Sequence, residues 1–75
     1  MSFPNTEILP RGTKLKILRE QERRSITDRL LFPVPQGEIV TVLRDFGAGK
    51  ILVWVPSLNT SEMLYLWDSD AERIA

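Results

Sequence analysis

The chain has 75 residues, ten of them basic and ten acidic, so its formal net charge is zero, and a chain this short builds only one compact domain. It contains neither cysteine nor histidine, which excludes disulfides, thiolate metal sites and the commonest general base. No apolar run has the length of a membrane span or a secretory signal. We therefore expect a cytoplasmic protein that is not an enzyme, has no catalytic residues, and needs neither a metal nor another cofactor.

Five segments have the pattern of β-strands. Polar and apolar residues alternate over 13–19, which predicts a half-buried first strand. β-Branched and aromatic residues predict further strands over 38–44, 50–55 and 63–67, and a short fifth strand is expected over 72–74. Alternate residues of these strands form the predicted core: Leu15, Ile17, Val40, Val42, Ile51, Val53, Val55, Leu64 and Leu66.

The connections between these segments indicate a meander. Residues 45–49 form a glycine-containing hairpin loop, 56–62 form a longer polar loop, and 68–71 are expected to form a 3₁₀ turn capped by Asp68. The segment 20–37 is charged and then apolar, with two prolines, so it predicts a long ordered loop. The predicted organisation is a tail over 1–10 and one all-β domain over 11–75. That domain is a small barrel of about five antiparallel strands with a long loop after the first.

Two predicted strand starts resemble those of known barrels. Residues 11–19 (RGTKLKILR) look like the first strand of small SH3-like barrels such as the E-type barrel protein of photosystem I. Residues 37–42 (GEIVTV) look like the strand start of those barrels and of KOW-type domains. The resemblance implies an SH3-like barrel, and it implies no activity, because it consists of strand residues.

The strands predicted over 50–55 and 63–67 are apolar on both faces. If Val53 and Val55 point into the core, alternation makes Leu52 and Trp54 point outward. An antiparallel register with Trp54 opposite Tyr65 keeps both faces consistent. It yields an aromatic–aliphatic patch as the candidate partner-binding site: Leu52, Trp54, Met63, Tyr65 and Trp67.

The chain itself offers an alternative cover for this patch. Apolar residues of the N-terminal tail (Phe3, Ile8 and Leu9) or of the long loop (Leu30, Leu31, Phe32 and Val34) are candidates to lie across it. A second copy of the chain, in a homodimer, is another.

Basic residues are concentrated in the first strand and the loop after it. They would contact an anionic partner, either an acidic protein surface or a nucleic-acid backbone: Lys14, Lys16, Arg19, Arg23, Arg24 and Arg29. The plainer interpretation is that these are solvated charges balanced by neighbouring acids. No aromatic residue is interleaved with them, which disfavours stacking on single strands.

These features favour a non-catalytic protein-interaction module, a small subunit or regulator that binds a larger protein assembly. The alternative is a nucleic-acid-binding or transcription- or translation-associated barrel of KOW type, which the zero net charge disfavours.

Overall fold

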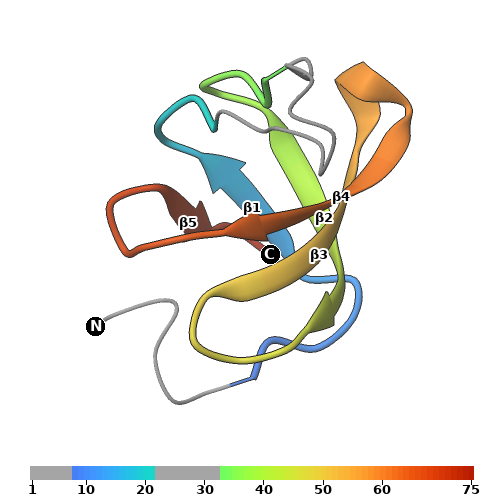
Figure 1. Ribbon diagram of the computed structural model, residues 1–75, viewed down its shortest axis with the longest axis vertical. Helices are drawn as coiled ribbons and strands as arrows, with labels where there is room; N and C mark the ends of the chain where they lie inside the picture. The colour runs from blue at the N-terminus through green and yellow to red at the C-terminus, as the bar shows by residue number, and fades with distance from the viewer. Residues whose placement is uncertain (1–7, 22–32) are drawn as a thin grey trace, which may run out of the picture.

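A computed structural model describes residues 8–21 and 33–75 of the chain, and these form a single five-stranded sheet (Figure 1). The strands are β1 (Lys14–Ile17), β2 (Ile39–Asp45), β3 (Lys50–Val55), β4 (Thr60–Tyr65) and β5 (Ala71–Arg73). All neighbours are antiparallel, in the order β4-β3-β2-β1-β5. The prediction of an all-β fold with five antiparallel strands is thus confirmed. None of the described residues belongs to a helix that is long and apolar enough to cross a membrane.

One hydrophobic core lies on the inner side of the curled sheet, where β4 crosses in front of β1 in Figure 1. Side chains alternate between the faces of a strand, so every second residue points inward. All of the predicted core residues are buried, which confirms the inward face of each strand. Leu9, Val34 and Ala71 also belong to the core, although the strand pattern did not identify them. Val34 lies outside the named strands and forms an isolated antiparallel bridge with Gln21.

A bulge in β2 decides where Arg44 lies. Val42 pairs with Val53. The next pair joins Arg44 to Leu52, so Leu43 is an extra residue in β2. Strict alternation after Val42 would have carried Arg44 to the inner face, whereas the bulge places it opposite the outward Leu52. A bulge also increases the local twist, which helps a small sheet to curl around its core.

A tight turn joins β2 to β3. Lys50 donates its N–H to the carbonyl of Gly47 at 3.0 Å, and the two residues between them both have positive φ, 55° and 82°. Positive φ at both central positions matches the right-handed twist of the flanking strands. The carboxylate of Asp45 fixes the turn, because it accepts the N–H groups of Gly47 and Leu9, each at 2.8 Å. The predicted hairpin loop over 45–49 is confirmed.

The connection between β3 and β4 is shorter than predicted. It consists of a 3₁₀ turn, η1 (Pro56–Leu58), and Asn59, whose φ of 51° is left-handed. Asparagine tolerates that conformation better than most residues. Asn59 donates its N–H to the carbonyl of Pro56 at 3.1 Å, so Thr60 already pairs with Val55. The predicted loop over 56–62 was therefore too long, and β4 begins before residue 63.

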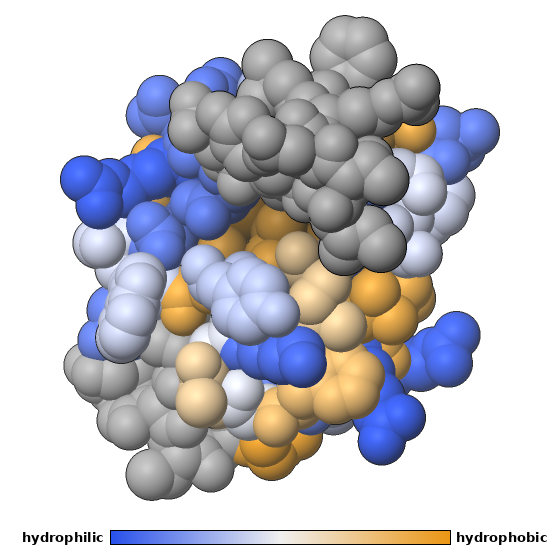
Figure 2. Space-filling view, in the orientation of Figure 1, coloured by the Kyte–Doolittle hydropathy of each residue, from blue (hydrophilic) through white to orange (hydrophobic). Residues whose placement is uncertain are grey.

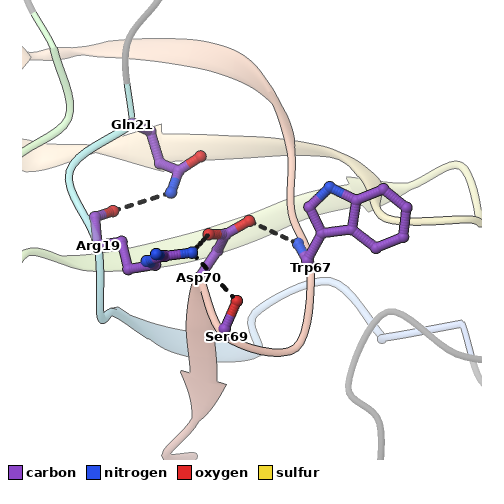
Figure 3. A network of polar contacts seen from close by, with 5 residues as sticks. All are labelled: Arg19, Gln21, Trp67, Ser69 and Asp70. Atoms are coloured by element: carbon purple, nitrogen blue, oxygen red, sulfur yellow. Dashed lines mark hydrogen bonds and ion pairs between the residues drawn. The ribbon is translucent and has the colours of Figure 1, made fainter.

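The turn between β4 and β5 is held by Asp70 (Figure 3). Its Oδ2 accepts the N–H of Trp67 at 2.8 Å, and its own N–H donates to the carbonyl of Trp67 at 2.9 Å. Its carbonyl accepts the N–H of Leu18 at 2.7 Å, which ties the turn to the end of β1. The expectation of a 3₁₀ turn capped by Asp68 was wrong. Asp68 is exposed, and the buried carboxylate that closes the turn belongs to Asp70.

Candidate functional site

The outer faces of β3 and β4 carry most of the predicted patch, but in a different register. Leu52 lies opposite Met63, and Trp54 lies opposite Ser61 rather than Tyr65. The predicted register was wrong because β4 begins earlier than expected. The difference is an even number of residues, so each side chain remains on its predicted face. Val53 and Val55 are buried, as predicted, whereas Trp54 is 37% exposed.

Four residues form a continuous apolar surface on this outer face, and we call it the β3–β4 patch. Leu52 and Met63 are a directly opposed, half-buried pair. Trp54 and Tyr65 occupy the two diagonals of that pair, within reach of its side chains. In the view of Figure 2, apolar atoms gather near the centre and lower right of the face, over β3, with strongly polar atoms beside them. The β3–β4 patch consists of Leu52, Trp54, Met63 and Tyr65.

Trp67 lies beyond the paired part of β4. The last named pair joins Lys50 to Tyr65, and the N–H of Leu66 extends the contact by donating to the carbonyl of Gly49 at 2.8 Å. Trp67 follows in the turn and is 74% exposed. The structure thus leaves it at the margin of the β3–β4 patch rather than opposite Leu52.

Ile39 adds to the apolar surface, although the sequence analysis did not include it. Thr41 of β2 pairs with Trp54, so Ile39 lies diagonal to Trp54 on the same outer face, and it is exposed. Alternation from the buried Val40 was a sufficient signal for its outward direction.

The residues proposed as a cover from within the chain have different positions. Leu9 and Val34 are buried in the core and do not lie across the outer face. Ile8 is exposed and lies beside the β2–β3 turn, with its Cδ1 3.6 Å from the position of a Cβ on Gly47. The other candidates lie outside the described residues: Phe3, Leu30, Leu31 and Phe32.

The described part of the predicted basic run is divided between two places. Lys14 and Lys16 are exposed on the outer face of β1, where Lys14 Nζ donates to Thr41 Oγ1 at 2.7 Å and Lys16 lies opposite Glu72. Arg19 instead lies beside Asp70, with Nη1 3.9 Å from Oδ1, at the turn before β5 (Figure 3). The remaining residues, Arg23, Arg24 and Arg29, lie outside the described residues.

A second basic group surrounds Phe46 at the end of the β2–β3 hairpin. The guanidinium carbon of Arg44 lies 4.7 Å from the centroid of the Phe46 ring, and Lys50 Nζ lies 5.7 Å from it. Lys50 also pairs with Tyr65. The sequence analysis missed this group, because the outward position of Arg44 depends on the bulge. We call these four residues the hairpin cluster: Arg44, Phe46, Lys50 and Tyr65.

The described residues contain no group of three acidic side chains that could hold a metal ion. The chemistry that the outer face does offer is binding, through apolar area, aromatic rings and cations. Comparison of the chain with protein-family models, with curated proteins and with solved structures found no match. The resemblance to SH3-like barrels therefore stays a prediction about the fold.

Proposed function

We propose that the protein is a non-catalytic interaction module of the cytoplasm, a small subunit or regulator that binds a larger protein assembly through the β3–β4 patch. The observation that carries this proposal is the position of Trp54 and Tyr65. Both rings are exposed, on the face of the sheet that the core does not use. Tryptophan, tyrosine and methionine are enriched at the centres of protein interfaces.

The patch also has a rigid support. β3 pairs with β2 on one side and β4 on the other, so the backbone beneath Leu52 and Trp54 is held along both edges. The opposite side of the same strand is fully buried. Side chains on such a scaffold lose little further freedom on binding, which reduces the entropic cost of association. A protein surface with apolar side chains would cover this area and remove it from water.

Trp54→Ala is expected to weaken binding of the partner by about 2 kcal/mol or more, as for a buried aromatic anchor. Ile74→Ser is the matched control, because Ile74 is another exposed apolar residue but lies after β5. The measurement is quantitative affinity capture with the wild type and both variants, together with their melting temperatures. The partner should be retained by the wild type and by Ile74→Ser, and lost by Trp54→Ala without a large change in melting temperature.

Other results would contradict this proposal. A large fall in the melting temperature of Trp54→Ala, with no protein lost selectively, would mean that the chain covers its own patch. A wild-type dimer in light scattering that Trp54→Ala converts to a monomer would mean that the partner is a second copy.

A further inference from the structure

The hairpin cluster places two cations beside two aromatic rings. Arg44 and Lys50 both lie near the ring of Phe46, at 4.7 and 5.7 Å from its centroid. Lys50 lies opposite Tyr65, whose side chain is 66% exposed. Two cations held near one ring raise the local positive potential, and an anion that approaches both is attracted to them.

Acidic side chains near the cluster in the described part of the chain are engaged or turned elsewhere. Asp70 is paired with Arg19, at the other connection. Asp45 is the nearest acid in sequence, but its two oxygens accept the backbone N–H groups of Leu9 and Gly47. Glu62 lies opposite the buried Val53, on the face of β4 that is turned away from the cluster. The outward residues of β1 to β4 therefore include cations but no acid.

Lys14 extends the positive surface across the sheet. It lies on β1, opposite Thr41, which in turn lies opposite Trp54. Lys50, Arg44 and Lys14 thus stand on the outer faces of three neighbouring strands, β3, β2 and β1. Neighbouring strands are about 4.8 Å apart, so this line of cations spans on the order of 10 Å. That length accommodates the backbone of a few nucleotides.

We propose that the hairpin cluster binds single-stranded nucleic acid, an activity beyond the protein binding proposed above. Phosphates would contact Arg44 and Lys50, with Lys14 further along the strand, and a base would stack on the exposed ring of Tyr65. Surfaces that bind single strands combine cations that follow the backbone with aromatic rings that accept any base. An acidic polypeptide would use the cations but not the rings, and a duplex would keep its bases out of reach of Tyr65.

The two proposed surfaces meet at Tyr65, which belongs to both. Leu52 lies diagonal to Tyr65 and continues toward the apolar pair with Met63. A small subunit with both surfaces would hold a protein and a single strand side by side.

The test is fluorescence anisotropy of the full-length chain with labelled oligothymidylate and oligouridylate of about ten nucleotides. Three phosphate contacts predict that the logarithm of the association constant falls with the logarithm of salt concentration with a slope of about −2. Arg44→Gln with Lys50→Gln should bring that slope to about −0.7, because one contact remains, and should weaken binding about tenfold or more at low salt. Arg11→Gln with Arg73→Gln removes the same charge from exposed positions elsewhere and should change the slope little.

Tyr65→Ala separates stacking from charge. It should weaken binding by about tenfold and leave the slope unchanged, and Tyr65→Phe should restore binding, because the ring stacks without its hydroxyl. The proposal is overturned if the wild type does not bind at low salt, or if the Arg11 and Arg73 pair has the same effect as the Arg44 and Lys50 pair. It is also overturned if polyglutamate competes as well as the oligonucleotides while Tyr65→Ala has no effect, since the surface would then bind acidic polypeptides. Melting temperatures confirm that each variant is folded.

Discussion

Leu15→Ala is expected to lower the free energy of unfolding by about 2–5 kcal/mol, the range for removing a large aliphatic side chain from a packed core. Leu15 is 0% exposed and lies on the central strand pair, opposite Val40 of β2 and Arg73 of β5. A domain of this size has only about 5 kcal/mol of stability to lose, so the variant should be largely unfolded at moderate temperature. Urea denaturation followed by circular dichroism measures the difference.

Lys16→Ala is the control for this experiment. Lys16 is the next residue of β1 and points to the exposed outer face. Its replacement should change the free energy of unfolding by less than about 1 kcal/mol. If the two variants were equally stable, the assignment of the inner and outer faces of β1 would be wrong.

Asp70→Ala is expected to cost about 1–3 kcal/mol of stability, because the N–H of Trp67 loses the carboxylate that accepts its hydrogen bond. Asp70→Asn should cost less, since the amide oxygen still accepts that bond. Arg19→Ala should cost under about 1 kcal/mol, because the Arg19 side chain is exposed and its ion pair with Asp70 is long, at 3.9 Å. Thermal denaturation of the three variants gives the order. Equal losses in Asp70→Ala and Arg19→Ala would show that the ion pair, and not the turn, is what Asp70 stabilises.

The faces of the strands were predictable from the sequence because alternation is local. The buried Val53 and the outward Trp54 follow from the period of a strand, whatever strand lies beside it. The register of β3 and β4 was not predictable in the same way. It depends on where the chain turns, and Asn59 in a left-handed conformation closes that turn earlier than the polar composition of 56–62 indicated.

Two further features depended on contacts that a pattern does not contain. The bulge at Leu43 moves Arg44 to the outer face, beside Phe46 and opposite Leu52, where strict alternation would not place it. Asp70 rather than Asp68 closes the last turn, because Asp70 is the one whose carbonyl also meets the N–H of Leu18. The patch was therefore predictable from the sequence, while the hairpin cluster forms only in the folded sheet.

The most direct test of the central claim is site-specific photocrosslinking in the cell. A photoreactive phenylalanine analogue would replace Trp54 or Met63 in the β3–β4 patch, and Ile74 as the control. The account predicts that one and the same protein is captured from Trp54 and from Met63, and is absent from the Ile74 variant. Capture of the same proteins from all three positions, or crosslinks from Trp54 and Met63 only to the chain itself, would contradict it.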